Sequence, residues 1–228
     1  MIMKKLVMIG LCLLIASCAS RMSNELTDEP GQKYVQGAPE QLYQTGNRYA
    51  KGIGVPRNYE QAALYYRSAA HQGYAKAQYS LGYMYRTGHG VPRDYNRAAA
   101  WFERAAQQGN SDAQYSLGVR YMLGQGTARD DGRALDWFQK AAAQGNPYAE
   151  NQLGFMYAAG KSVPQDYTIS IQWYQKAAEH GLASAQYNLG LMYANGIGTQ
   201  PDKEKARQLF QLAAARGFEP ARKALEQY

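Results

Sequence analysis

Cysteine and histidine are scarce in this chain of 228 residues. It has two cysteines and three histidines, too few for a disulfide-rich scaffold and a poor basis for a zinc site with several ligands. Charged residues make up only 19% of the chain, but hydrophobic residues make up 46%, which is a globular and not a disordered composition. What the chain has in excess is tyrosine, with 20 Tyr against 5 Phe and 3 Trp, and glycine, with 23 residues.

The N-terminus has the features of an export signal. Lys4 and Lys5 precede an apolar run, residues 6–15, that is too short to cross a bilayer as a helix, which needs about 20 residues. A basic start, a short apolar run and small residues after it are typical of a secretory signal peptide. The segment that follows, Leu14-Ile15-Ala16-Ser17-Cys18, resembles the lipobox of bacterial lipoproteins.

The lipobox resemblance implies a signal peptide over residues 1–17 and acyl chains, such as palmitate, on Cys18. Ala19 follows where an Asp would resemble an inner-membrane retention signal, so the resemblance implies a periplasm-facing, lipid-anchored protein on the outer membrane. An ordinary signal peptide with a chance cysteine is the alternative. Residues 18–38 comprise this cysteine and a mostly polar stretch without periodicity, which we predict to be a flexible tether.

From residue 39 onward the chain repeats itself every 36 residues. Gly46 is followed at this step by Gly82, Gly118, Gly154 and Gly190, and tyrosines and Ala-Ala pairs keep the same step. A fixed period of this length, kept in several registers over five copies, is typical of a solenoid of small stacked units.

The second copy, residues 75–110, indicates what one unit looks like. Ala77, Leu81 and Tyr85 recur at every fourth position, which places them on one face of a helix. Glycines after this helix predict its end. Asp94 then stands where the N-cap of a second helix is expected. The other copies have good capping residues at the same place: Asn58, Asp130, Asp166 and Asp202.

Residue size indicates how the two helices pack. Gly82 and Ala98 are small and allow close approach, whereas Trp101 and Phe102 supply large apolar area. One pair cannot bury all of its apolar surface, so neighbouring pairs must stack. The last segment, residues 219–228, begins like a sixth first helix and is predicted to cap the stack.

The pattern Ala-x-Ala-Gln-Tyr-x-Leu-Gly-x-x-Tyr-x-x-Gly-x-Gly, found at residues 75–90, resembles the Sel-one-like repeat (SLR), a relative of the tetratricopeptide repeat. The resemblance implies an all-α fold: a right-handed α-solenoid of five helix-loop-helix repeats of 36 residues plus a C-terminal capping helix. Departures are local, such as Ser162 in place of Gly and Ser170 in place of Ala. The expected repeats are 39–74, 75–110, 111–146, 147–182 and 183–218.

We find no constellation of residues that predicts an enzyme. Gly-x-Ser-x-Gly and His-Glu-x-x-His motifs are missing, and Asp130-Asp131 is interpreted as an N-cap and its neighbour. His71, His89 and His180 occupy non-equivalent repeat positions, where we expect exposed helix ends or loops. We therefore predict no catalytic residues, no cofactor, no metal and no small-molecule substrate.

The net charge of +7 does not by itself indicate nucleic-acid binding. Arg57, Arg93 and Arg129 recur in the loops between helices, but Gln165 and Pro201 stand at the same place in two copies. Because no basic stripe emerges, we do not predict a nucleic-acid partner.

The remaining candidate site is the surface formed by the first helices, which line the concave face in stacks of the tetratricopeptide kind. Away from the core positions this surface is aromatic and apolar, and tyrosine is enriched at binding hot spots. The predicted partner-binding residues are Tyr43, Tyr79, Tyr83, Arg86, Tyr115, Val119, Met122, Tyr148, Phe155, Tyr187 and Leu191.

Two interpretations stay open for the first tyrosine of each helix, which can bind a partner or pack on the next repeat; these are Tyr43, Tyr79, Tyr115 and Tyr187. The position four residues further along the helix varies between copies, so its residues are better candidates for partner choice. They are Tyr83, Val119, Phe155 and Leu191.

We expect a non-enzymatic, membrane-anchored protein–protein interaction scaffold in the bacterial envelope, with a protein partner in the concave groove. The family resemblance also implies an alternative, an immunity protein that neutralises a toxin delivered by a secretion system, for example a lipase effector. An envelope enzyme of unrecognised type is the second alternative.

Overall fold

The computed structural model describes residues 33–226. The predicted signal peptide, Cys18 and most of the predicted tether lie outside the described residues. Within the described part there are eleven α-helices and no strand. The first helices of the five repeats are α2 (Pro39–Lys51), α4 (Ala75–Thr87), α6 (Ser111–Leu123), α8 (Pro147–Ala159) and α10 (Ala183–Asn195). The second helices are α3 (Tyr59–His71), α5 (Tyr95–Gln107), α7 (Asp131–Ala142), α9 (Tyr167–Glu179) and α11 (Lys203–Ala215).

A shorter helix, α12 (Glu219–Leu225), follows the fifth pair. The predicted all-α fold, an α-solenoid of five helix-loop-helix repeats with a terminal helix, is thereby confirmed. No helix of the described segment is both long enough and apolar enough to cross a membrane.

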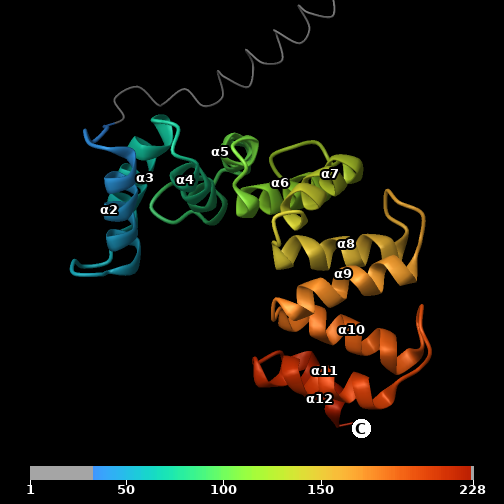
Figure 1. Cartoon of the computed structure of the whole chain (residues 1–228). Helices are drawn as coiled ribbons and strands as arrows, with labels where there is room; N and C mark the ends of the chain where they lie inside the picture. Colours follow the sequence, from blue (N-terminus) through green and yellow to red (C-terminus); the bar gives the residue numbers. More distant parts are fainter. Residues whose placement is uncertain (1–32, 227–228) are drawn as a thin grey trace, which may run out of the picture. The chain divides into compact units, whose positions relative to one another are not determined.

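Two compact units make up the chain, and they divide between Ala105 and Ala106. In the C-terminal unit each helix from α6 to α12 packs against the next one, and the helices α8 to α12 lie side by side in Figure 1. In the N-terminal unit α2 packs against α3, and α3 against α4. Packing between consecutive helices is the arrangement of a stacked-repeat protein, in which each unit is stabilised by its neighbours.

The helix ends follow the sequence closely. Each first helix ends in a left-handed glycine, as at Gly88 (φ 78°) and Gly124 (φ 65°). The second helices begin at the predicted N-caps: the Asp130 side chain accepts from the backbone N–H of Arg133, and Asp166 accepts from Ile169. These capping predictions are confirmed.

Glycine inside the first helix is what lets the two helices of a pair touch. A Cβ placed on Gly118 would lie 2.7 Å from the Phe138 ring, and one on Gly82 would lie 2.8 Å from the Phe102 ring. Both rings are fully buried. The same contact recurs in the other three pairs, at Gly46 with Tyr66, Gly154 with Tyr174 and Gly190 with Phe210.

The two departures noted in the fourth repeat are accommodated differently. Ser170 is fully buried where other copies have alanine, and its hydroxyl donates to the Gly154 carbonyl at 2.7 Å. Ser162 keeps the left-handed backbone of the glycine that it replaces, with φ 57°, and is the one non-glycine residue with positive φ among those described.

Candidate protein-binding surface

The first tyrosine of each helix packs within the stack. The ring centroid of Tyr115 lies 5.9 Å from that of Phe138 in its own pair and 5.6 Å from that of Tyr148 in the next repeat. Tyr187 makes the same two contacts with Phe210 and Phe218. These tyrosines are half-buried, so one part of each ring stabilises the stack and the rest faces solvent. Their role in partner binding stays a prediction.

The aromatic residues that vary between copies are more exposed. Tyr83 of α4 has an exposed fraction of 41%, and Phe155 and Tyr148 of α8 have 40% and 53%. The Arg86 guanidinium lies 4.6 Å from the Tyr83 ring centroid, and the Lys161 ammonium lies 5.1 Å from that of Phe155. Each ring therefore forms an apolar surface with a cation beside it, a combination suited to protein contacts.

The other predicted residues on these helices are less accessible. Val119 and Met122 of α6 and Leu191 of α10 are half-buried, as are Tyr43 and Tyr79. Leu191, however, lines a cavity.

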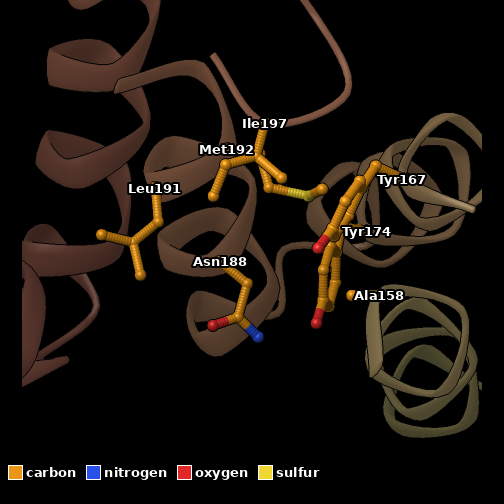
Figure 2. A pocket seen from close by; sticks show the side chains of 7 residues that line it. All are labelled: Ala158, Tyr167, Tyr174, Asn188, Leu191, Met192 and Ile197. Atoms are coloured by element: carbon orange, nitrogen blue, oxygen red, sulfur yellow. The ribbon is translucent and has the colours of Figure 1, made fainter. Parts of the chain in front are cut away.

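A cavity of about 170 Å³, open to solvent, lies between α8, α9 and α10. In Figure 2 the rings of Tyr167 and Tyr174 from α9 face Asn188, Leu191 and Met192 from α10. Its lining residues are Ala158, Tyr167, Tyr174, Asn188, Leu191, Met192 and Ile197.

Most of this cavity was not predicted from the sequence, although one signal was available. Ala158 stands at the helix position that Arg86 and Met122 occupy in the second and third repeats. A small residue in place of two long ones leaves space beside the neighbouring repeat.

The side chain of a buried tyrosine lines this space. Tyr174 is only 5% exposed, and burial raises the pKa of its phenol to about 12, so the group stays protonated near neutral pH. At the same position of the first repeat, the Tyr66 hydroxyl donates to Asn47 Oδ1 at 2.8 Å. In the fourth repeat Phe155 takes the place of Asn47, and no hydrogen bond joins the Tyr174 hydroxyl to another described residue.

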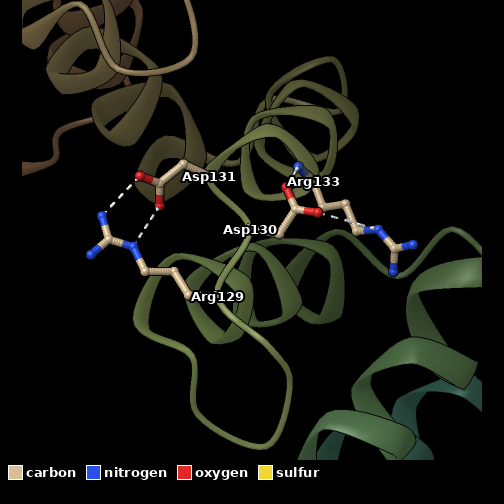
Figure 3. A network of polar contacts seen from close by, with 4 residues as sticks. All are labelled: Arg129, Asp130, Asp131 and Arg133. Atoms are coloured by element: carbon tan, nitrogen blue, oxygen red, sulfur yellow. Dashed lines mark hydrogen bonds and ion pairs between the residues drawn. The ribbon is translucent and has the colours of Figure 1, made fainter.

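The adjacent carboxylates Asp130 and Asp131 point to different arginines (Figure 3). Arg129 donates to both oxygens of Asp131, at 2.9 and 3.2 Å, while Asp130 caps α7 and lies 3.6 Å from the Arg133 side chain. Hydrogen bonding to Arg129, supported by its charge, lowers the pKa of Asp131, and the same bond raises that of Arg129. The two carboxylates contact different arginines, in agreement with their interpretation as a cap and a neighbour.

The three histidines are exposed, as predicted, but each contacts a neighbour. His71 lies edge-on to Tyr34 and Trp101, and His89 stacks on Tyr59 with ring centroids 4.9 Å apart. His180 Nδ1 lies 2.9 Å from Oε2 of the buried Glu150, a contact that sequence reasoning missed. Among residues 33–226, no three His, Cys, Asp or Glu side chains are grouped in a way that could hold a metal ion.

Repeated helix pairs that stack on one another and expose variable aromatic residues define a helical-repeat scaffold, a class of protein suited to protein–protein interaction. The Sel1 repeat profile matches residues 42–74, 75–110, 111–146, 147–182 and 183–218, and the chain therefore belongs to the Sel1 repeat family. Proteins of this family are generally non-enzymatic scaffolds. No curated protein sequence matches the chain.

Solved structures of the same family are similar to this chain. A protective antigen of uropathogenic Escherichia coli with an SLR fold has 42% identity and a TM-score of 0.75, over 82% of this chain and 40% of that protein. This chain thus spans well under half of that relative. A Sel1 repeat protein of Oxalobacter formigenes has 37% identity and a TM-score of 0.79, over 82% of this chain and 76% of that one.

An immunity protein of Pseudomonas aeruginosa has 24% identity and a TM-score of 0.56, over 88% of this chain and 71% of that one. At this identity the similarity concerns the fold.

Proposed function

We propose that the protein is a membrane-anchored scaffold of the bacterial envelope that binds a protein partner through the first helices of its repeats. The distribution of exposed apolar side chains carries this proposal. Of the nine large ones in the described part, six lie on first helices or the loops that follow them, and two lie on second helices. Exposed apolar groups gathered on one set of helices mark a contact surface.

The proposal is tested by removing two exposed rings on first helices. Tyr83→Ala combined with Phe155→Ala is expected to abolish capture of the partner by the full chain, because exposed aromatic residues dominate binding energy at such surfaces. Leu212→Ala is the matched control, since Leu212 is 51% exposed but lies on the second helix α11. Helicity should be unchanged in both variants. Capture that survives the double substitution would count against this surface.

The membrane anchor rests on the lipobox resemblance around Cys18. Two or more acyl chains hold a protein firmly on a membrane, each buried CH₂ contributing roughly 0.8 kcal/mol. Cys18→Ser is therefore expected to release the protein from membranes or to block its processing. If the variant fractionates like the unmodified chain, the anchor proposal is wrong.

A toxin is the second candidate for the partner. Its support is the fold that this chain shares with proteins described as immunity proteins of Pseudomonas aeruginosa. This candidate predicts a toxin gene next to the gene for this chain, and rescue of growth when both products are directed to the periplasm. Loss of rescue with Tyr83→Ala and Phe155→Ala would place the toxin on the first-helix surface. A neighbourhood without such a gene favours an assembly scaffold.

A further inference from the structure

We infer that the cavity between α8, α9 and α10 is an anchor pocket that takes one tyrosine side chain of the protein partner. The inference rests on the proposed function and adds the chemistry of the group that is recognised. Leu191, already predicted to contact the partner, forms one wall of this pocket.

The size of the pocket selects a single ring. Its volume of about 170 Å³ is close to the roughly 150 Å³ of an engineered protein cavity that binds benzene. Sites for cofactors or larger ligands measure about 300–1,000 Å³. The walls made by Ala158, Leu191, Met192 and Ile197 are apolar, as a ring requires.

The polar groups of the pocket favour a ring that carries an oxygen. Tyr174 is buried as a residue, but its hydroxyl oxygen still reaches solvent; the hydroxyl remains a donor near neutral pH and has no hydrogen-bond partner among the described residues, so it is left to water. A ring that fills the pocket displaces this water, and the hydroxyl is then left unpaired, at a cost in free energy, unless the ring brings an acceptor. A tyrosine phenol offers an apolar body for the walls and an oxygen that can accept this bond, whereas phenylalanine offers only the body.

The fourth repeat is the copy that combines the two features. The first repeat also has a small residue, Ala50, but there Tyr66 donates to Asn47. The fifth repeat pairs a small residue with Phe210, which has no hydroxyl.

The mouth of the pocket is apolar as well. Tyr167 and Ile197 have exposed fractions of 38% and 37%. A bound side chain would cover both of them, so binding buries apolar surface in addition to forming the hydrogen bond.

The test titrates three small probes into the full chain held in lipid nanodiscs: N-acetyl-tyrosinamide, N-acetyl-phenylalaninamide and N-acetyl-alaninamide. Binding is followed by NMR on the ¹³C-labelled methyl of Met192, which lines the pocket and is 5% exposed. The tyrosine probe is expected to shift this signal saturably. The phenylalanine probe should bind about three- to tenfold more weakly, the value of one hydrogen bond, and the alanine probe should give no shift.

Three variants assign the effect to the pocket. Tyr174→Phe, the residue of three other repeats, should bring the affinities for the tyrosine and phenylalanine probes to within about twofold of each other. Ala158→Met, the residue of the third repeat, should fill the space and abolish binding of both. Ala50→Met makes the same change at the same helix position of the first repeat and should leave binding intact.

Circular dichroism verifies that all three variants keep their helices. No saturable shift with the tyrosine probe, equal affinities for both aromatic probes, or binding that survives Ala158→Met would each overturn the inference. Because the titration uses no partner, its failure leaves the test with Tyr83 and Phe155 standing. Failure of that capture test, in turn, leaves the titration interpretable.

Discussion

Glu150 stands where the second, third and fifth repeats have a buried glutamine. In the third and fifth repeats a glutamine stands here, and its amide donates to a carbonyl of the preceding second helix: Gln114 Nε2 to Ala106 at 3.2 Å and Gln186 Nε2 to Ala178 at 3.3 Å. An ionised glutamate cannot donate, yet Glu150 is only 3% exposed. Its Oε2 instead lies 2.9 Å from Nδ1 of His180, at the end of the next helix.

This pair predicts a conditional effect of substitution. His180→Ala should lower the free energy of unfolding by about 1–3 kcal/mol, because a buried carboxylate loses its hydrogen-bonded partner. In a Glu150→Gln background the same change should be nearly neutral, since the amide can bond to a backbone carbonyl as Gln114 does. Urea unfolding of the four proteins in this cycle measures the difference. Equal costs in both backgrounds would show that the pair is not coupled.

Tyr174 predicts how stability changes in base. Its pKa is raised to about 12 by burial, above the usual value near 10, so between these values the phenol is neutral when folded and ionised when unfolded. The contribution of the neutral Tyr174 phenol to the free energy of unfolding is complete below pH 10 and is lost as the pH rises towards 12. The loss amounts to roughly 2–3 kcal/mol for the full shift.

The measurement is the urea midpoint at pH 9 and at pH 11.5. Tyr174→Phe should lose less stability than the unmodified chain over this interval, because it has no phenol to ionise at this site. Parallel losses would mean that another group controls unfolding in base; Tyr66, whose pKa is raised to about 12 by burial and by the nearby Tyr43, is the alternative to examine.

The structural role of a single residue was predictable from the sequence where that role depends on neighbouring residues in the chain. The caps at Asp130 and Asp166 follow from residue type and position alone, because the cap bonds to a backbone N–H three residues away. The bond between Glu150 and His180 joins residues 30 positions apart. This contact depends on how one repeat packs against the next, so a pattern of neighbouring residues does not predict it.

At the scale of helices, the contact between Gly118 and Phe138 sets how closely α6 and α7 approach. Gly118→Ala would place a Cβ 2.7 Å from the buried ring, so we expect a loss of about 1–3 kcal/mol from overpacking. Gly132→Ala is the control of opposite sign. Gly132 is exposed in α7, and alanine there should be neutral or stabilise the helix by up to about 1 kcal/mol.

Unfolding in urea gives both values. Similar effects of the two substitutions would mean that helix propensity, and not the close approach of the two helices, is what these glycines determine.

The loop between α8 and α9 stores strain at Ser162. Its φ of 57° is a left-handed conformation that costs an ordinary residue roughly 1–2 kcal/mol. Glycine avoids this cost, but its greater freedom in the unfolded chain offsets part of the gain in stability. Ser162→Gly should therefore raise the free energy of unfolding by about 0.5–1 kcal/mol.

The reverse change in the fifth repeat provides the control. In Gly198→Ser the new Cβ would collide with the Tyr167 side chain, so this variant should be less stable than the unmodified chain. A Ser162→Gly variant with unchanged stability would show that the loop relaxes around the serine at no cost.

Helices and their pairing were predictable because the 36-residue period repeats the same apolar face five times. The cavity beside Leu191 was not, because it arises from differences between copies and not from what they share. Ala158, Tyr174 and Phe155 are each acceptable variants of the repeat when taken alone. Only the packing of α8, α9 and α10 shows that together they leave a space and a hydroxyl with no hydrogen bond to another described residue.

At the scale of the whole chain, charge is distributed unevenly between the two units. Residues 33–105 contain ten Lys and Arg against four Asp and Glu, whereas residues 106–226 contain twelve against eleven. The net positive charge of the described part therefore belongs mainly to the first two repeats. The proposed contact residues Tyr83 and Arg86 belong to this positive unit, whereas the proposed pocket beside Leu191 belongs to the nearly neutral one.

Nearest-neighbour packing also determines how far a defect spreads. Ala221 of α12 is fully buried against Phe210 of α11, so Ala221→Asp places a charge where no water reaches and should open the terminal helices. Because stability in a stacked-repeat protein is the sum of neighbouring contacts, amide exchange should accelerate by at least about tenfold in α11 and α10, and not at all in α2 to α4. Lys223→Asp, on the exposed side of α12, should change neither region. Exchange that accelerates uniformly from α2 to α12 in the Ala221 variant would mean that the chain unfolds as one cooperative body and not repeat by repeat.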